Sequence, residues 1–194
     1  MIATRNRDKF REIQDKLRAL PLATLSLADF PLVDDVVEDQ PDLYGNAIKK
    51  ATEISHHTGL WVLSDDTGLE VEALGGAPGV FSARYSGPGA TYESNCRKLL
   101  GEMKDVPDGR RQAQFRTVLC LRTSDGLYCV EGAVEGTIGR ERRGANGFGY
   151  DPVFVLPSGL TMAEIDLAEK NQISHRGRAL ERMARLLRFL LGSD

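Results

Sequence analysis

The chain has 194 residues, and its 25 lysines and arginines against 28 aspartates and glutamates give a formal net charge of −3. This length predicts a single domain over residues 1–194, or one domain with a small lobe. The acidic balance disfavours a general nucleic-acid coat, which is usually basic, so we expect no nucleic-acid partner. No apolar run reaches the roughly 18 residues that a spanning helix needs, so we expect no membrane partner either.

The cysteines and the N-terminal segment bear on where the protein works. Three cysteines, Cys96, Cys120 and Cys129, make an odd count, and the chain has no CxxC motif. We therefore expect neither a disulfide scaffold nor a zinc ribbon, and a reducing cytoplasm is the plain inference. The first segment is charged by Arg5, which is not typical of a secretory signal.

The first half of the chain predicts strands that alternate with helices. A short strand over residues 1–4 leads into a helix over residues 7–19, for which Asn6 is a suitable N-cap. A second helix begins after Asp42 and ends at Gly59, because apolar residues recur there at helical spacing. We also expect strands over residues 22–27, 60–64 and 69–74, and an acidic irregular stretch over residues 34–41.

The second half predicts a long hairpin and a C-terminal helix. Apolar residues alternate over 113–121 and 127–138 on either side of a turn signal at residues 124–126, which is typical of antiparallel partner strands. Ser174 is a suitable cap for the last helix. We also expect a glycine-rich loop over residues 75–89, a helix over 91–100 and a strand over 150–156. This mixture predicts an α/β fold with a mixed sheet, and two lobes around a cleft would suit the pattern.

A candidate anion-binding turn lies at the first strand-to-helix junction. The free N–H groups of a helix N-terminus bind anions, and the helix dipole adds to the attraction. Thr4 and Asn6 could donate hydrogen bonds there, and Lys9 could supply charge to a phosphate. The alternative is an ordinary capped surface helix with solvated charges. The segment that forms this turn consists of Thr4, Arg5, Asn6, Arg7, Asp8 and Lys9.

Two adjacent carboxylates, Asp65 and Asp66, stand where a short apolar strand is expected to end. Open α/β sheets bind ligands at the carboxyl ends of strands, and neighbouring strand residues point to opposite faces, so one carboxylate would face a site. Carboxylate oxygens suit Mg²⁺, which bridges to substrate phosphates, and Glu38 in the acidic stretch is a candidate second ligand. The alternative is a polar turn that ends a strand.

Three later segments carry further candidates. Phe148 or Tyr150 could stack on a planar base, and Asp151 could accept a hydrogen bond from a ring N–H. His175 and Arg176 follow the cap of the last helix, where positive charge opposes the helix dipole and an anionic or electron-rich ligand would relieve the conflict. The alternatives are core aromatic residues, a turn aspartate and solvated charges. After the glycine-rich segment, a structural role is the favoured interpretation of Arg84.

Taken in order, these segments resemble the inosine triphosphate pyrophosphatase family, also called the Ham1-like family of noncanonical purine nucleoside triphosphate pyrophosphatases. The matching stretches are ATRNRDKFREI, NAIKKA, SDDTGLEVEALGGAPGVFSARYSG, GFGYDPVF and SHRGRAL. They span residues 3–180, and the long central block together with FGYDP and SHR is highly specific. The resemblance implies an ITPase-like α/β fold with an elongated mixed central sheet, flanking helices, two lobes around a substrate cleft, and a homodimer.

The resemblance also implies an activity, the Mg²⁺-dependent hydrolysis of ITP, dITP and XTP to the monophosphate and pyrophosphate. This reaction cleanses the nucleotide pool of deaminated purines. Asp66 is implied as the residue that activates water, and Glu38 and Asp66 as the metal ligands. Lys50 and Thr67 are implied as phosphate contacts, in addition to the anion-binding turn. The implied base pocket consists of Phe148, Gly149, Tyr150, Asp151, Lys170, His175 and Arg176.

The chemistry of these residues agrees with such a reaction. Phosphoanhydride hydrolysis is mostly positioning and charge stabilisation, so a water near Asp66 or on Mg²⁺ is the expected attacker and no covalent nucleophile is needed. Hypoxanthine and xanthine carry a 6-oxo acceptor where adenine carries a 6-amino donor. Lys170, His175 or Arg176 would pair with the oxo group and repel the amino group.

Two departures from the family pattern stand out. Only two residues precede the Ala-Thr pair, where the family usually has a fuller first strand. Gly45 stands where the family more often has a glutamate, so we do not expect this position to bind a metal or to support a metal ligand, while Glu38 remains available. Two other functions stay open. One is a pyrophosphatase with another preferred base, and the other is a noncatalytic nucleotide-binding protein, expected to lack Glu38, Asp66 or Lys9, all of which are present.

Overall fold

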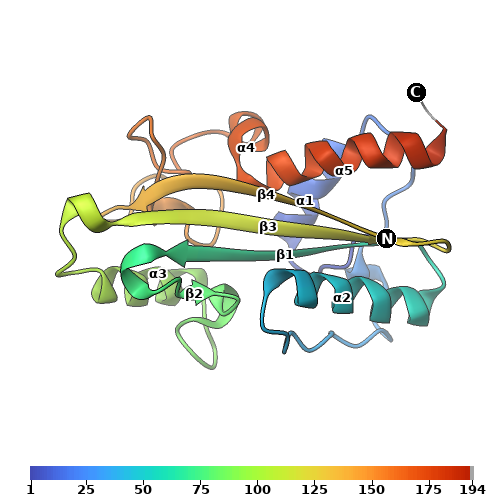
Figure 1. The fold of residues 1–194 in the computed structure, drawn as a ribbon, viewed down its shortest axis with the longest axis horizontal. Coiled ribbons are helices and arrows are strands. Elements are labelled where there is room, and N and C mark those ends of the chain that lie inside the picture. Colours follow the sequence, from blue (N-terminus) through green and yellow to red (C-terminus); the bar gives the residue numbers. More distant parts are fainter. Residues whose placement is uncertain (193–194) are drawn as a thin grey trace. The chain divides into compact units, whose positions relative to one another are not determined.

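The computed structural model describes residues 1–192, which form an α/β fold (Figure 1). The α-helices are α1 (Arg7–Leu17), α2 (Leu43–Thr58), α3 (Tyr92–Glu102), α4 (Leu167–Ile173) and α5 (His175–Leu191). The strands are β1 (Val62–Val71), β2 (Pro78–Gly79), β3 (Gln112–Arg122), β4 (Leu127–Ile138) and β5 (Phe154–Val155). The predicted fold class is confirmed. None of the helices described is long and apolar enough to cross a membrane.

The strands form a five-stranded sheet in the order β2-β1-β3-β4-β5. β1 pairs antiparallel with β2, and β4 pairs antiparallel with β5. Ile2 makes isolated parallel bridges to Ser26 and to Leu63. The parallel pairings expected of a mixed sheet are therefore supplied by the N-terminal segment.

The chain divides into two compact units. The first contains residues 1–66, residues 117–132 and the segment from His175 onward. The second contains Thr67–Arg116 and Ala133–Ser174. The boundaries fall within β1, β3 and β4, so each of these long strands contributes residues to both units.

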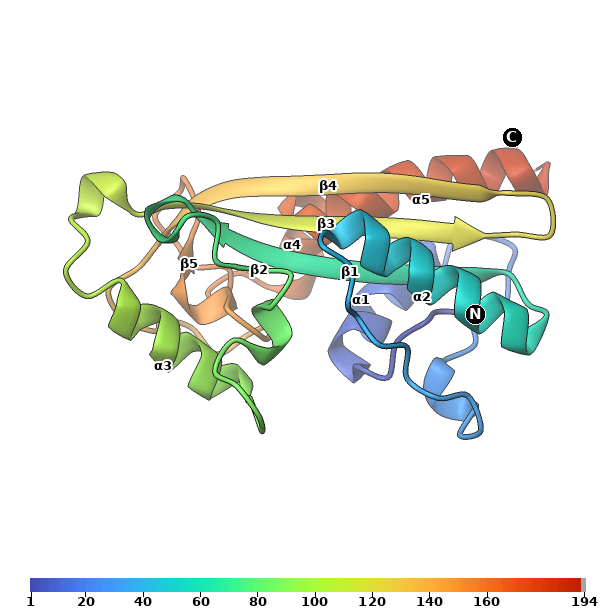
Figure 2. The same cartoon turned by 60° about the horizontal axis from the view of Figure 1, so that its bottom comes forward.

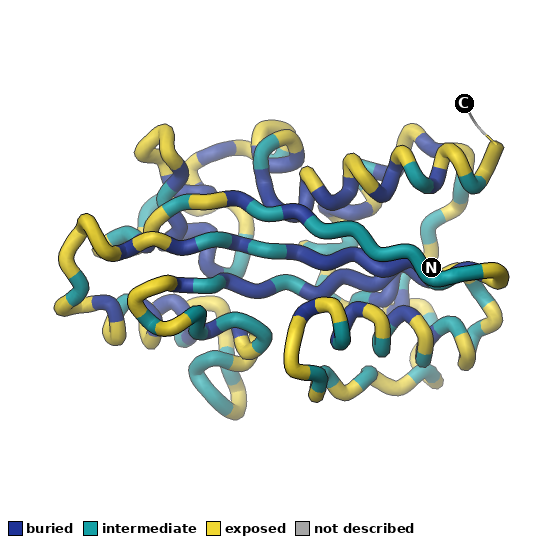
Figure 3. The backbone as a smooth tube through the Cα atoms, in the orientation of Figure 1, coloured by how far each residue is buried: buried dark blue, intermediate teal, exposed yellow. Residues whose placement is uncertain are grey.

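The first unit has helices on both faces of its strands. One buried apolar cluster joins Ile13 of α1 and Leu180 of α5 to Leu63 of β1. Another joins Ile54 of α2 to Val62 of β1. Adjacent strand residues point to opposite faces, so the first unit has α/β/α layers. Figure 3 shows β1 buried along most of its length, while the outer surfaces of α2 and α5 are exposed.

Helix α2 lies along β1 and runs in the opposite direction (Figures 1 and 2). Near the end of α2, Ile54 packs with Val62 at the start of β1. Two residues further along the strand, the Ser64 hydroxyl donates to the Ala47 carbonyl at 2.6 Å. Asp66, the next residue on the same strand face, therefore lies toward the N-terminal turns of α2.

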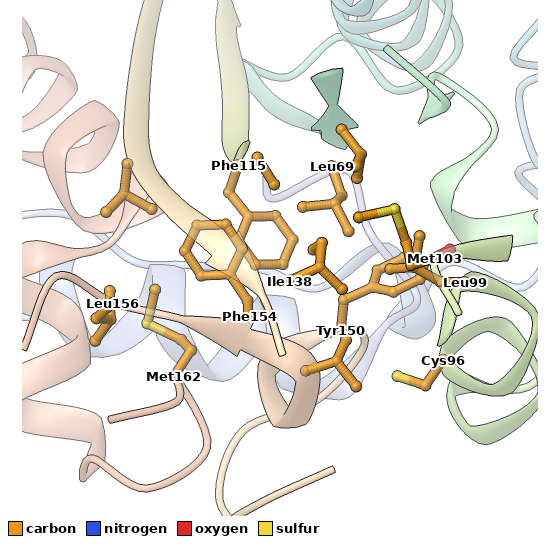
Figure 4. Packing of buried hydrophobic residues seen from close by; sticks show 14 of the residues in the cluster. Leu69, Cys96, Leu99, Met103, Phe115, Ile138, Tyr150, Phe154, Leu156 and Met162 are labelled. Carbon is orange, nitrogen blue, oxygen red and sulfur yellow. The ribbon is translucent and has the colours of Figure 1, made fainter. Parts of the chain in front are cut away.

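The second unit is built around its own apolar core (Figure 4). The rings of Phe115 in β3 and Phe154 in β5 lie 4.6 Å apart between centroids. Leu69 of β1 and Leu99 of α3 complete the same cluster, and both are fully buried. This core anchors the loop before β5, because Tyr150 belongs to it.

One predicted strand boundary is wrong, and it bears on the candidate site. The strands expected over residues 60–64 and 69–74 are one continuous strand, β1, so Asp65 and Asp66 lie within a strand rather than at its end. In the sequence, two consecutive aspartates are typical of a turn. The strand continues because Asp65 has a buried cationic partner, Arg176, which local sequence does not reveal.

Two other segments predicted as strands form tighter local structure. Residues 22–27 give only a bridge at Ser26, followed by a 3₁₀ turn over Leu27–Asp29 with a capping box. Residues 150–156 form a 3₁₀ turn over Asp151–Val153 before the short β5. In the first segment the Ser26 side chain caps the turn, and in the second Pro152 stands in the first turn, so a local turn replaces strand pairing in each.

Two features were not predicted. Helix α4 begins at a cap in which Asp166 Oδ1 accepts from the Glu169 N–H at 2.8 Å. Cys120 of β3 and Cys129 of β4 face each other and form a disulfide with an S–S distance of 1.99 Å. The odd cysteine count led us to expect no disulfide framework, and this pair contradicts the reasoning from the cysteines. Cys96 is a buried free thiol.

Gly132 of β4 faces the first turn of α5, where a β-carbon would lie 2.2 Å from the His175 carbonyl oxygen and 2.6 Å from the Ala179 nitrogen. We expect Gly132→Ala to displace this turn and lower the free energy of unfolding by about 1–3 kcal/mol. Thermal or urea denaturation measures the change. Gly101→Ala in α3 is the control, because a β-carbon there meets no atom within 4 Å. Equal stability of the two variants would contradict the close approach.

Candidate active site

The turn that leads into α1 is shaped by its own side chains. Asn6 caps the helix, since its Oδ1 accepts from the backbone N–H groups of Asp8 at 2.9 Å and Lys9 at 3.2 Å. Thr4 Oγ1 accepts from the Asn6 N–H at 3.1 Å. Arg7 and Asp8 are exposed on the same turn. The predicted helix start is thus present, and its dipole can favour an anion beside Lys9.

Arg5 is used differently from the other residues of this turn. Its Nε donates to Asp35 Oδ1 at 2.8 Å. Its terminal nitrogens donate to the carbonyls of Leu27, at 3.3 Å, and Val33. Arg5 therefore ties the acidic stretch to the turn. These contacts occupy its guanidinium group, which was predicted to bind substrate.

The carboxylate of Asp65 is the centre of a buried charge network. Arg176 Nε donates to Asp65 Oδ2 at 2.8 Å, and Lys9 Nζ lies 2.5 Å from Oδ1. Arg176 also donates to Glu12 Oε2 at 2.5 Å. Burial alone would raise the pKa of Asp65, but Arg176 and Lys9 outweigh burial and hold this pKa well below its usual range. The network joins α1, β1 and α5 in the first unit.

Glu12 was not among the predicted site residues. It lies in α1 beside the fully buried Ile13 and is itself 4% exposed. Charged residues are almost never so buried unless they are paired, so a carboxylate on an apolar helix face is a signal that could have found it. The sequence does not reveal the partner, because 164 positions separate Glu12 from Arg176.

The neighbouring carboxylate of Asp66 has the opposite electrostatic character. Its Oδ2 is buried and has no hydrogen-bond partner among residues 1–192. Burial raises the pKa of Asp66. The positive charges of Lys50 and Lys9 oppose this rise, whereas the negative charges of Glu38 and Asp65 add to it. The resulting pKa of Asp66 is about 6. A buried carboxylate with a pKa near neutrality has the properties of a general base.

Lys50 of α2 connects Glu38 to the same part of β1. Its Nζ donates to the Glu38 carboxylate and, at 3.2 Å, to the Asp65 carbonyl. Burial would lower the pKa of Lys50, but Glu38, Asp66 and Asp65 together raise it. Lys50 is therefore a fixed positive charge between the acidic stretch and the strand.

The acidic stretch is fastened to α2 by three further hydrogen bonds. Lys49 Nζ donates to the Val37 carbonyl at 2.9 Å and to Asp39 Oδ1 at 2.8 Å. The backbone N–H of Gln40 donates to Asn46 Oδ1 at 3.0 Å. These bonds hold the loop that carries the predicted metal ligand against the helix.

Gly45 allows this loop to pack closely. A β-carbon at Gly45 would lie 2.7 Å from Gln40 Cβ and 3.4 Å from Asp42 Oδ1. A glutamate, as the family more often has here, would require the loop to move away. Glycine at residue 45 therefore allows the Gln40 side chain to pack directly on α2.

In the second unit, the predicted base-pocket residues gather around Asp151. Asp151 Oδ2 accepts from the Phe148 N–H at 2.8 Å and from Lys170 Nζ at 2.6 Å. Lys170 Nζ also lies 4.6 Å from the centre of the Phe148 ring. The centres of the Tyr92 and Phe148 rings are 5.7 Å apart. Asp151 and Lys170 are buried, whereas Phe148 is half-buried. An aromatic ring beside a fixed ammonium and carboxylate suits a planar heterocycle.

Glycines make this loop possible. Gly147 has a φ of +69°, and a β-carbon there would collide with Asp151 Oδ2 at 2.1 Å. Gly149 has a φ of +62°, and its carbonyl accepts from the Cys96 thiol at 3.2 Å. The backbone can therefore fold back over the Asp151 carboxylate only with glycine at residue 147.

The remaining predicted residues are placed as follows. Tyr150 is buried in the core, and its hydroxyl donates to a backbone carbonyl at 2.8 Å, so Phe148 is the better candidate for stacking. His175 is buried in the first turn of α5, and Thr67 is half-buried in β1. The Arg84 guanidinium lies 5.2 Å from the centre of an aromatic ring in its own loop, which agrees with a structural role.

Each unit presents its own set of ligand-binding groups. The first presents a helix N-terminus, Lys9, Lys50 and a buried reactive carboxylate. The second presents an aromatic ring with a fixed donor and acceptor. Among the residues described, no group of three or more His, Cys, Asp or Glu side chains could hold a metal ion by itself. These groups, in an α/β protein, are of the kinds that bind phosphates and planar heterocycles.

The chain belongs to the Ham1 family, whose family model matches residues 1–186. A relative from Geobacter sulfurreducens, named dITP/XTP pyrophosphatase, is 50% identical over 182 residues, which cover 93% of this chain and 92% of the relative. A relative of the same name from Shigella flexneri is 46% identical over 193 residues, which cover 97% of both chains. The predicted family is confirmed.

Solved structures agree with this assignment. A HAM1 protein from Coxiella burnetii matches with a TM-score of 0.87 and 42% identity, over 96% of each chain. The Ham1 protein of Staphylococcus aureus matches with a TM-score of 0.86 and 34% identity, over all of this chain and 98% of the other. The ITPase-like fold predicted from the sequence is therefore confirmed.

The raised pKa of Asp66 predicts a stability change that depends on pH. Between about pH 4 and pH 6 the carboxylate ionises in the unfolded chain but not in the folded one, so the folded state loses stability as the pH rises. With EDTA present, we expect Asp66→Asn to raise the free energy of unfolding by up to about 3 kcal/mol at pH 8 and by nothing below pH 4. Urea denaturation across this range measures the effect.

The exposed Asp125→Asn is the matched control, and we expect no such dependence from it, since Asp125 lies in the β3–β4 turn. A destabilised Asp66→Asn at pH 8 would contradict the assignment of Asp66 as an uncompensated buried carboxylate.

Proposed function

We propose that this chain hydrolyses ITP, dITP and XTP to the monophosphate and pyrophosphate, and so removes deaminated purines from the nucleotide pool. Membership of the Ham1 family and the name of the two relatives support this activity. The observation that carries it is the buried Asp66 carboxylate, whose pKa of about 6 suits a base that activates water.

Mg²⁺ is the cofactor that suits the first unit. Glu38 and Asp66 are hard oxygen donors beside Lys50, and the charge of the buried Asp66 is not fully compensated, so a divalent cation would stabilise its ionised form. Mg²⁺ usually takes one or two carboxylates and completes its shell with water and phosphate oxygens, so two protein ligands are sufficient. Bound there, it would offset phosphate charge.

The residues of the chain account for phosphate binding and proton transfer. The N–H groups at the start of α1, Lys9 and Lys50 offset the negative charge of the triphosphate. Asp66 accepts a proton from the water that attacks the α-phosphorus. The bond between this phosphorus and the bridging oxygen breaks, and pyrophosphate leaves. Asp65 holds Lys9 in place through their ion pair.

Base recognition is supported by the second unit. The half-buried Phe148 ring offers a stacking face, which is worth about 1–3 kcal/mol per base in single-strand binders. Lys170 is a donor, so it suits the 6-oxo group of hypoxanthine and xanthine and opposes the 6-amino group of adenine. Arg176, also predicted to donate to the base, is fully buried with its guanidinium on Asp65 and Glu12, and we assign it to positioning Asp65.

The resemblance to the family further supports a homodimeric, cytoplasmic enzyme. Its partners would be small-molecule purine nucleotides, without nucleic acid or membrane.

Pyrophosphate release from ITP, XTP, ATP and dGTP, each with Mg²⁺ and with EDTA, tests the proposal. We expect cleavage of ITP and XTP that requires the metal. Cleavage of ATP should be on the order of 10⁴-fold slower, because its 6-amino group would meet the Lys170 donor. dGTP shares the 6-oxo group, so its cleavage reports how the site treats the 2-position.

A folded protein that cleaves none of these nucleotides would contradict the activity and favour a noncatalytic nucleotide-binding protein. Faster cleavage of an 8-oxopurine or a modified pyrimidine would favour another preferred base. Hydrolysis in ¹⁸O-labelled water locates the attack. Label in the monophosphate supports attack at the α-phosphorus, and label only in pyrophosphate overturns it.

A further inference from the structure

Asn46 Nδ2 and Asp66 Oδ2 are buried in the first unit, and neither has a hydrogen-bond partner among residues 1–192. Asn46 is 1% exposed and Asp66 is 5% exposed. Buried polar atoms without a partner are rare, because they have lost their hydrogen bonds to water and gained none from the protein. The Asn46 donor and the Asp66 acceptor, both buried without a hydrogen-bond partner, therefore require an explanation.

Helix α2 and β1 run antiparallel (Figure 2), and a side-chain contact between them fixes how they are aligned. The Ser64 hydroxyl donates to the Ala47 carbonyl at 2.6 Å, which places this point of β1 against the second turn of α2. Asp66 is the next residue on the same strand face, one step toward the start of α2, where Asn46 precedes Ala47. Asp66 also interacts electrostatically with Lys50, one helical turn after Asn46.

The two atoms are chemically complementary. The Asn46 amide needs an oxygen to accept its hydrogen, and Asp66 Oδ2 needs a hydrogen. A metal cation bound by Asp66 would still leave the Asn46 N–H group without an acceptor. A single water molecule satisfies both atoms, because it accepts from one and donates to the other.

We infer that Asn46 is a further catalytic residue, which together with Asp66 holds the water that attacks the nucleotide. This inference rests on the proposed pyrophosphatase function. The Asn46 amide occupies one lone pair of the water, and the other lone pair forms the new bond to the α-phosphorus. One water hydrogen moves to Asp66 Oδ2 as that bond forms, and pyrophosphate leaves with the electron pair of the broken P–O bond.

The Asn46 amide has a second, separable role. Its Oδ1 accepts from the Gln40 N–H and so helps to hold the acidic loop. Asn46→Asp keeps this acceptor but loses the donor, whereas Asn46→Leu loses both. Lys49→Ala is the matched control, since Lys49 holds the same loop at Val37 and Asp39.

The experiment measures kcat and KM for ITP, the Kd of the nonhydrolysable α,β-methylene analogue, and the melting temperature of each variant. We expect kcat to fall on the order of 100-fold in both Asn46 variants, because a misplaced reactant loses about that much rate. The analogue Kd should change by less than about threefold, since the donor contacts the water and not the nucleotide. Lys49→Ala should keep the wild-type kcat.

Three results would overturn the inference. Asn46→Asp with the kcat of the wild type would mean that only the loop contact matters. An activity loss in the Asn46 variants that appears as weaker analogue binding, or that Lys49→Ala shares, would make Asn46 a structural residue. Wild-type protein without any pyrophosphate release would overturn the proposed function itself, which distinguishes that failure from the failure of Asn46 alone.

Discussion

The buried carboxylate of Asp65 is the constraint on which the arrangement of the first unit depends. A carboxylate in the protein interior is strongly unfavourable unless it is paired and hydrogen-bonded. Asp65 has Arg176 from α5 and Lys9 from α1 as partners, so the N-terminal turns of both helices must meet β1 at this residue. That requirement fixes the anion-attracting start of α1 beside the strand and places Lys9 on it.

The next residue shows how a strand can separate structural from chemical roles. Successive residues of β1 point to opposite faces, so Asp65 and Asp66 lie in different surroundings although they are neighbours. Asp65 meets cations in direct contact and has a pKa well below the usual range. Asp66 faces α2, where burial outweighs the more distant charge of Lys50 and raises its pKa to about 6. One carboxylate therefore organises the fold, and the other is left reactive.

Local sequence patterns predicted much of the fold, but they could not predict contacts between residues that are far apart in the sequence. The Asn6 cap and the β3–β4 hairpin were predicted because their signals lie within a few residues. The continuity of β1 and the role of Glu12 were missed, because both depend on Arg176, which is far away in the sequence. Family motifs indicated the candidate site residues, but they did not reveal that structural contacts occupy the Arg5 guanidinium group.

The kcat of Asp66→Asn for ITP tests most directly the claim that Asp66 is reactive and Asp65 structural. Our account predicts a fall of about 10²–10⁴-fold, because the variant loses the base that accepts a proton from the attacking water. It predicts that Asp65→Asn, measured alongside, melts at a lower temperature than the wild type. An Asp66→Asn variant with the turnover of the wild type would contradict the account.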